Sequence, residues 1–180
     1  MQRTTHDPQH PATSYRLRVP RPEDAEAFAA VRLASWRAAY RGVFDERVFV
    51  EQEQQNPQRV EGYRWWFEQM DATGYDTEAR TEAQRRGLVA VDAAARLVGV
   101  ASTRTAPGEI TELTLLYTLP EVFGAGVGRM LLNELLGDQP ARLEVLAANP
   151  RAIAFYRKHG FAETGKTATF GGHKTLVMAR

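Results

Sequence analysis

The chain of 180 residues has the size of one domain, and its composition of 43% hydrophobic and 25% charged residues is typical of a globular protein. Its net charge of +1 gives no electrostatic reason to expect nucleic acid or a membrane as a partner. The absence of cysteine excludes disulfides, thiolate nucleophiles and cysteine-ligated metals. The isolated histidines near the N-terminus lack a third ligand, so we expect no metal site.

From the sequence we expect neither a membrane anchor nor a secretory signal peptide. No apolar run approaches the length of a membrane span, and residues 1–14 lack the apolar stretch of a signal peptide. We therefore expect a cytoplasmic protein with a flexible polar tail over 1–14 and a single domain over 15–180.

The first half of the domain is expected to be mainly helical. Residues 15–19 alternate apolar and polar side chains, which predicts a strand. A helix over 22–42 is indicated by proline and acidic residues at its start, and by basic residues and glycine at its end. Residues 45–70 predict one or two amphipathic helices interrupted near Pro57, and residues 71–87 predict a long polar connection.

The second half is expected to alternate between strands and helices, because the hydrophobic pattern changes to a period of two after residue 87. The expected elements are strands over 88–92, 97–105 and 110–119, a helix over 127–136, a strand over 141–147, a short helix over 149–160, and a hairpin around 171–172. This order predicts an α/β fold of the three-layer α+β kind, built around one sheet.

Three glycines at alternating positions, Gly124, Gly126 and Gly128, lead into the helix expected next. A helix N-terminus has unpaired N–H groups that attract anions, and glycine lets a ligand approach the backbone closely. A tight turn alone would need one glycine, so the pattern favours a phosphate cradle made of main-chain amides. The dinucleotide fingerprint would need glycine at Arg129 or Leu131, and the P-loop needs Gly-Lys-Ser/Thr, so both are excluded.

Two stretches resemble signatures of the GCN5-related N-acetyltransferase (GNAT) family. LLYTLPEVFGAGVGRMLLNELL (115–136) is similar to its acetyl-CoA motif, and NPRAIAFYRKHGF (149–161) to its second signature. SWRAAYRG (35–42) resembles the first helix of a bacterial subset, and the likeness in element order runs from Tyr15 to the C-terminus. The resemblance implies a mixed central sheet of about six to seven strands flanked by helices. Phe123 departs from the pattern, since the family usually has Gln or Arg there.

The resemblance also implies an acetyl-CoA-dependent N-acetyltransferase, in which a primary amine of a small molecule or peptide attacks the thioester directly. Acetyl-CoA would be a co-substrate. The residues implied to bind it are Leu116, Tyr117, Thr118, Leu119, Phe123, Gly124, Ala125, Gly126, Val127, Gly128, Arg129, Asn149 and Tyr156. Asn149 would contact the pantetheine arm and also cap its own helix.

The resemblance assigns catalytic roles to two residues. Tyr156 would donate a proton to the leaving thiolate, the alternative being that it only packs beside Phe155. Glu112 would be the base, because an unbroken strand puts it on one face with Thr114, Leu116 and Thr118. The alternatives are that Glu112 is simply exposed, that Glu109 takes its place, or that a water chain removes the proton.

The acceptor site is implied to lie between the first helix region and the final hairpin. Trp36, Tyr40 and Phe44 would line it from one side and His173 from the other. The alternative for Trp36 and Tyr40 is a place in the core, and for His173 a solvated hairpin end.

Other readings of the function stay open from sequence alone. The donor could be a larger acyl-CoA, such as propionyl- or succinyl-CoA, or the protein could be a non-catalytic CoA-binding regulatory protein. The chain would act as a monomer or a homodimer.

Overall fold

The computed structural model describes residues 14–77 and 83–180. The predicted tail over 1–14 therefore lies outside the described residues, except for Ser14. Within the described part, no helix is both long and apolar enough to cross a membrane.

Three helices form the N-terminal part of the chain. A short 3-10 turn, η1 (Pro22–Asp24), leads directly into α1 (Ala25–Tyr40), and α2 (Glu46–Gln54) and α3 (Asn56–Glu68) follow. The break between α2 and α3 falls next to Pro57, which occupies the first turn of α3, where its missing N–H costs nothing. The prediction of helices over 22–42 and 45–70 is confirmed.

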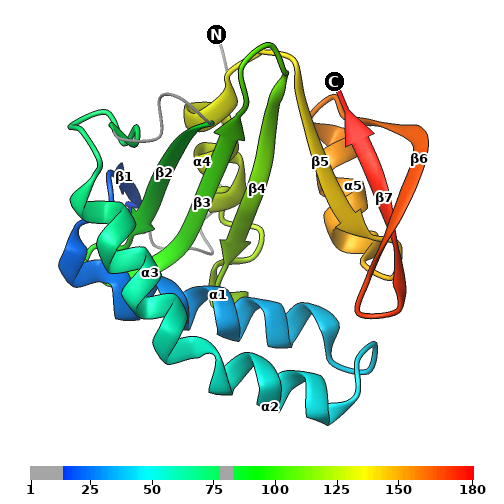
Figure 1. The fold of residues 1–180 in the computed structure, drawn as a ribbon, viewed down its shortest axis with the longest axis horizontal. Helices are drawn as coiled ribbons and strands as arrows, with labels where there is room; N and C mark the ends of the chain where they lie inside the picture. Colours follow the sequence, from blue (N-terminus) through cyan, green and yellow to red (C-terminus); the bar gives the residue numbers. More distant parts are fainter. Residues whose placement is uncertain (1–13, 78–82) are drawn as a thin grey trace, which may run out of the picture.

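A seven-stranded mixed sheet forms the centre of the molecule (Figure 1), in the order β1-β2-β3-β4-β5-β7-β6. The strands are β1 (Arg16–Arg18), β2 (Gln84–Val91), β3 (Leu97–Thr105), β4 (Thr111–Thr118), β5 (Ala141–Leu146), β6 (Ala162–Phe170) and β7 (His173–Ala179). The pair of β4 and β5 is parallel, and the other neighbours are antiparallel. Between strands lie η3 (Pro120–Val122) and the helices α4 (Val127–Leu136) and α5 (Pro150–Lys158). The predicted fold class is confirmed.

The prediction of a connection over 71–87 is wrong at its end, because β2 begins at Gln84. Its first residues are polar, but they pair with β3 from Gln84↔Thr105 onwards. The guanidinium of Arg85 lies over the ring of Trp66, with 4.1 Å between Cζ and the ring centroid. The stem of a long charged side chain can cover apolar surface in this way, so tertiary pairing overrides the polar composition.

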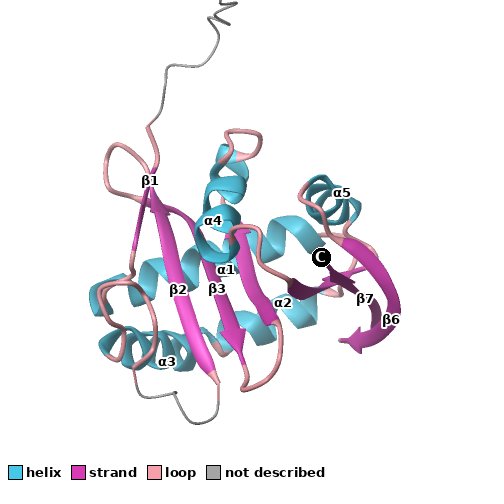
Figure 2. Ribbon diagram, turned by 90° about the horizontal axis from the view of Figure 1, so that it is seen from above, coloured by secondary structure: helices cyan, strands magenta, loops and turns pink. Residues whose placement is uncertain are grey.

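Helices cover both faces of the sheet (Figure 2), which gives three layers. On one face α4 packs through Val127, Leu131 and Leu132 against β2, β3 and β4. On the other face α1 and α3 pack through Phe28 and Trp66.

Candidate functional site

The strands β4 and β5 separate after a short parallel ladder. Their register runs over only three pairs, from Thr111↔Ala141 to Leu113↔Leu143. Beyond this point the strands diverge, as Figure 1 shows. Backbone groups on the facing edges of the two strands then have no strand partner across the gap, so they can bind an extended ligand.

A β-bulge lies in β4 beside this separation. Ser102 pairs with Leu115 and Thr103 with Leu113, which leaves Thr114 as the extra residue. The hydroxyl groups of Thr114 and Ser102 hydrogen-bond at 2.8 Å, and Thr114 also donates to the Ser102 carbonyl at 3.1 Å. Because of the bulge, Leu113 and Leu116 both pack on the α4 side of the sheet, although they are three residues apart.

The bulge changes the position of Glu112. The expectation that Glu112 shares a face with Leu116 assumed an unbroken strand, and this assumption is wrong. Glu112 accepts a hydrogen bond from the Arg142 guanidinium at 3.2 Å, and the same guanidinium nitrogen donates to Glu109 at 3.0 Å. Neither glutamate is among the residues that line the pocket described below. The structure therefore gives no support to Glu112 or Glu109 as the base.

The glycine loop presents the N-terminus of α4. Gly124 and Gly126 have φ angles of 82° and 84°, a left-handed conformation that glycine adopts without strain. Gly126 is the N-cap of α4 and has no side chain to cap the helix. The first-turn amides of Val127, Gly128 and Arg129 have no acceptor within the helix. They form the anion-attracting end that the sequence predicts.

A pocket of about 650 Å³ connects this loop with the gap between β4 and β5. Residues 122–129 and the α5 side chains of Phe155 and Tyr156 line one end. Ser35 and Tyr40 of α1 line the other end, together with residues of β4 and β5. The pocket is thus continuous from the α4 amides on one face of the sheet to α1 on the other.

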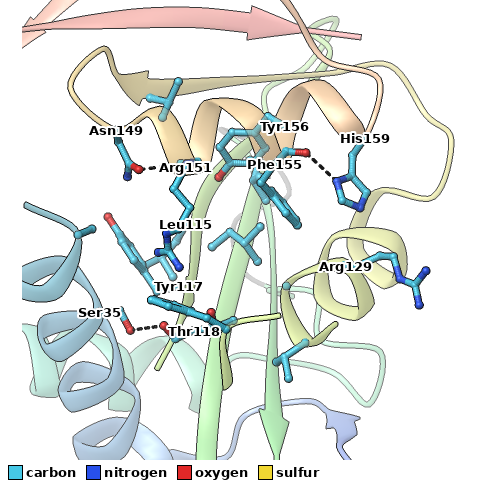
Figure 3. Close-up of a pocket in the computed structure, with 18 of the residues that line it drawn as sticks. Ser35, Leu115, Tyr117, Thr118, Arg129, Asn149, Arg151, Phe155, Tyr156 and His159 are labelled. Atoms are coloured by element: carbon cyan, nitrogen blue, oxygen red, sulfur yellow. Dashed lines mark hydrogen bonds between the residues drawn. The ribbon is translucent and has the colours of Figure 1, made fainter. Parts of the chain in front are cut away.

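Tyr156 projects from α5 into this pocket (Figure 3). Its ring packs edge-on against Phe155 and Phe161, with centroid distances of 5.3 and 5.8 Å. Burial raises the pKa of the Tyr156 hydroxyl well above its ordinary value, and Tyr117 and Tyr40 add to the effect. The phenol therefore keeps its proton at neutral pH and is available as a donor.

Arg151 and Phe123 form a contact across the pocket. The Arg151 guanidinium lies over the Phe123 ring, with 3.4 Å between Cζ and the centroid. Burial lowers the pKa of Arg151, and Tyr40 opposes the effect. Figure 3 shows Arg151 pointing into the pocket, whereas Arg129 points away from it. A cation–π contact of this kind positions the positive charge of Arg151 beside the glycine loop.

The comparisons with known proteins agree with this geometry. Residues 83–163 match the family model described as the acetyltransferase (GNAT) domain. Over these residues the chain is similar to the GNAT acetyltransferases. Coenzyme A is the ligand in a structure of similar fold, the PaiA N-acetyltransferase from Thermoplasma acidophilum in complex with coenzyme A. That structure is 22% identical with a TM-score of 0.66, and the match covers 91% of this chain and 98% of that one.

Two further solved structures have a similar fold. The apo form of YjaB from Escherichia coli is 22% identical with a TM-score of 0.60, and the match covers 92% of this chain and 97% of that one. An acetyltransferase from Thermus thermophilus is 19% identical with a TM-score of 0.59, and the match covers 93% of this chain and 96% of that one. At these identities the likeness shows the fold alone.

Most residues predicted to bind acetyl-CoA line the pocket described above. The exception is Leu119, which does not line it and whose amide donates to the Val98 carbonyl at 2.9 Å. Asn149 caps α5 by accepting a hydrogen bond from the Ala152 amide at 3.0 Å, as predicted. Its amide nitrogen also donates to the Tyr40 hydroxyl at 3.4 Å. Asn149 thus links α5 to α1 across the pocket.

The predicted acceptor residues divide into two groups. Tyr40 lines the pocket. Trp36 and Phe44 are buried, 3% and 6% exposed, and stack in an aromatic cluster with their ring centroids 5.2 Å apart. His173 packs edge-on against Phe44 at 4.7 Å. These three side chains form the wall behind Tyr40 and do not line the pocket itself.

Ser35, Glu144 and His159 are polar residues of the pocket that the sequence reasoning missed. Ser35 on α1 is 3% exposed and donates to the Thr118 carbonyl at 2.9 Å, which ties the end of β4 to α1. Glu144 on β5 lines the pocket. The sequence feature that could have identified Glu144 is that it is a lone carboxylate within the apolar stretch LEVL of β5. No group of side chains suited to holding a metal ion occurs within 14–77 and 83–180.

Proposed function

We propose that this protein is a GNAT acetyltransferase, which transfers the acetyl group of acetyl-CoA to a primary amine of a small molecule or peptide by direct attack of the amine on the thioester. The observation that carries this proposal is the continuous pocket from the α4 amides to Tyr40. A donor and an acceptor can enter from opposite faces of the sheet and meet where β4 and β5 separate.

The donor end of the pocket suits coenzyme A. The first-turn amides of α4 would bind the diphosphate, because they are unpaired in the helix and lie at its positive end. The gap between β4 and β5 would receive the pantetheine arm as an additional strand-like segment. Arg151 and Lys158, which both line the pocket, supply positive charge for the phosphates. Bound acetyl-CoA would supply the activated acyl group.

Groups at the reacting centre would stabilise the oxyanion and protonate the leaving thiolate. A backbone amide of β4, within residues 116–118, would stabilise the oxyanion that forms when the nitrogen attacks. The Tyr156 hydroxyl would donate its proton to sulfur as the C–S bond breaks. Asn149 holds the first turn of α5 and thereby the direction in which this helix presents Tyr156.

The Phe123 contact leads to a prediction about donor affinity. Phe123→Ala removes the ring on which the Arg151 guanidinium lies. A cation–π contact is worth about 0.5–2 kcal/mol, so the Kd for acetyl-CoA is expected to rise about twofold to thirtyfold. Isothermal titration calorimetry measures the change. Val50→Ala is the matched control, because Val50 and Phe123 are similarly exposed, 42% and 41%, and Val50 lies on α2 away from the pocket. An equal Kd for the two variants would contradict a role for the contact.

The activity itself is tested by thiol release from acetyl-CoA in the presence of a panel of primary amines, with mass spectrometry of the product. The proposal predicts release that depends on the amine and a product heavier by one acetyl group. Parallel reactions with propionyl- and succinyl-CoA identify the acyl group preferred. Saturable CoA binding without release from any of the three donors would favour the non-catalytic regulatory alternative.

A further inference from the structure

Arg32 and Arg59 form a cationic pair where three helices meet. Arg32 lies on α1 and Arg59 on α3, and both contact Gln52 of α2. The side-chain oxygen of Gln52 accepts hydrogen bonds from Arg32 Nη2 at 3.3 Å and from Arg59 Nη2 at 3.1 Å. Arg59 Nη2 also donates to Gln55 Oε1 at 2.8 Å. The two positive charges thus meet at one neutral oxygen.

The pair lacks a counter-charge. Neither arginine forms an ion pair in the described part of the chain. Every other arginine within 14–77 and 83–180 that hydrogen-bonds a side chain reaches an aspartate or a glutamate. Burial lowers the pKa of Arg59, and the positive charge of Arg32 adds to the effect. Because like charges repel each other, this arrangement favours the binding of an anion.

The two guanidinium groups have hydrogen-bonding capacity that the protein leaves unused. Arg32 Nη1 and Arg59 Nε are buried and have no hydrogen-bond partner among the described residues. An unpaired buried donor is costly, and in a native structure it calls for an explanation such as a bound ligand. Both residues are only partly buried, so the pair is open to solvent. A carboxylate or phosphate group would supply both the acceptor oxygens and the missing negative charge.

The pair adjoins the α1 side of the pocket. Arg32 lies three residues before Ser35, which lines the pocket, and residues at this spacing are neighbours on a helix surface. Burial raises the pKa of the Tyr117 hydroxyl, Tyr40 adds to the effect, and the positive charge of Arg32 opposes it. Tyr117 lines the same pocket, so the charge of Arg32 acts on a molecule bound at this side.

We infer that Arg32 and Arg59 bind an anionic group, a carboxylate or a phosphate, of the acceptor. This inference rests on the proposed function, because the amine of the same molecule must reach the thioester. The acceptor is then a primary amine with an anionic group in the same molecule, such as an amino acid or the phosphate of an amino alcohol. The α4 amides lie on the other face of the sheet, which keeps the phosphates of the donor apart from the anionic group of the acceptor.

The test compares amines that differ by an anionic group. 4-Aminobutyrate is paired with butylamine, and 2-aminoethyl phosphate with 2-aminoethanol. Thiol release from acetyl-CoA gives kcat/KM for each amine, and calorimetry gives the Kd for acetyl-CoA. We expect the wild type to prefer the anionic member of at least one pair about tenfold to a hundredfold, the effect of charge-assisted hydrogen bonds. The pair with the larger preference distinguishes a carboxylate from a phosphate.

Two variants test the site in different ways. Arg32→Gln removes one positive charge, whereas Gln52→Glu keeps both arginines and gives them a carboxylate of the protein itself. Both should lower kcat/KM for the anionic amine about tenfold to a hundredfold, while kcat/KM for its counterpart and the Kd for acetyl-CoA stay within about twofold. Since Gln52→Glu adds ion pairs, its melting temperature should not fall, so its loss of preference would not come from unfolding.

Arg47→Gln is the matched control. Arg47 lies on α2 with its side chain 90% exposed, and its nearest carboxylate oxygen, in Asp45, is 3.9 Å away. The substitution removes a positive charge from the same group of helices and should leave the preference unchanged.

The contrary outcomes can be told apart. A wild-type preference that persists in both Arg32→Gln and Gln52→Glu would overturn the assignment to this pair. Equal kcat/KM within both pairs of amines, or transfer to none of the four by a protein that binds acetyl-CoA, would overturn the anionic acceptor while leaving the donor site in place. Failure to bind acetyl-CoA would overturn the proposed function itself, and the inference with it.

Discussion

Replacing Tyr156 with Phe is expected to lower kcat for acetyl transfer at least about tenfold, since general acid catalysis contributes effects of this size or larger. The variant loses only the hydroxyl that faces the pocket. The ring keeps its packing against Phe155 and Phe161. We therefore expect the melting temperature and the Kd for acetyl-CoA to stay near the wild-type values, and steady-state thiol release to show the loss in kcat.

Tyr63→Phe is the matched control for this prediction. Tyr63 is a partly buried tyrosine that packs against Phe28 at 4.6 Å, and it does not line the pocket. Its kcat should equal that of the wild type. If a single-turnover measurement gave Tyr156→Phe an unchanged chemical step, Tyr156 would be a packing residue and another donor would protonate the thiolate.

Gly128→Ala is expected to weaken acetyl-CoA binding at least about tenfold without destabilising the fold. Gly128 lies in the first turn of α4, where its φ is not in the left-handed region, and an added Cβ would meet the Phe155 ring at 3.5 Å, an ordinary contact. Alanine in a helix is more stable than glycine by about 0.5–1 kcal/mol, so the melting temperature should stay or rise. The methyl group would, however, occupy the space between α4 and α5 in which we place the diphosphate.

Calorimetry and thermal unfolding of the same sample separate these two effects. Gly62→Ala is the matched control, since Gly62 is a helical glycine in α3 with no atom within 4 Å of an added Cβ. It should gain stability in the same way and keep the wild-type Kd. Wild-type affinity in Gly128→Ala would mean that the phosphates bind elsewhere.

Local patterns in the sequence were enough to predict much of the fold and the donor end of the pocket. The predicted helix over 127–136 coincides with α4, because glycines mark both its start and its end. The Asn149 cap of α5 is likewise encoded by neighbouring residues. The early start of β2 was missed, because the polar residues from Gln84 become a strand only through pairing with β3.

The acceptor end of the pocket could not be predicted in the same way, because it depends on features that no local sequence pattern reveals. At the bulge, Thr114 hydrogen-bonds with Ser102, twelve residues away. Because of the bulge, Glu112 does not share a face with Leu116 as the unbroken strand predicted. Glu144 enters the pocket only because β5 leaves β4 after Leu143. Phe123, the residue that departs from the family pattern, acquires a partner in Arg151 of a later helix. Each of these depends on how distant segments meet in space.

The most direct test of the account is a calorimetric titration of the wild-type protein with acetyl-CoA. A pocket that binds the diphosphate with the α4 amides and the pantetheine arm between β4 and β5 predicts one saturable site per chain with a Kd in the micromolar range, about 1–100 µM. Absence of saturable binding at a concentration of about 1 mM would contradict the donor site and the acetyltransferase activity built on it.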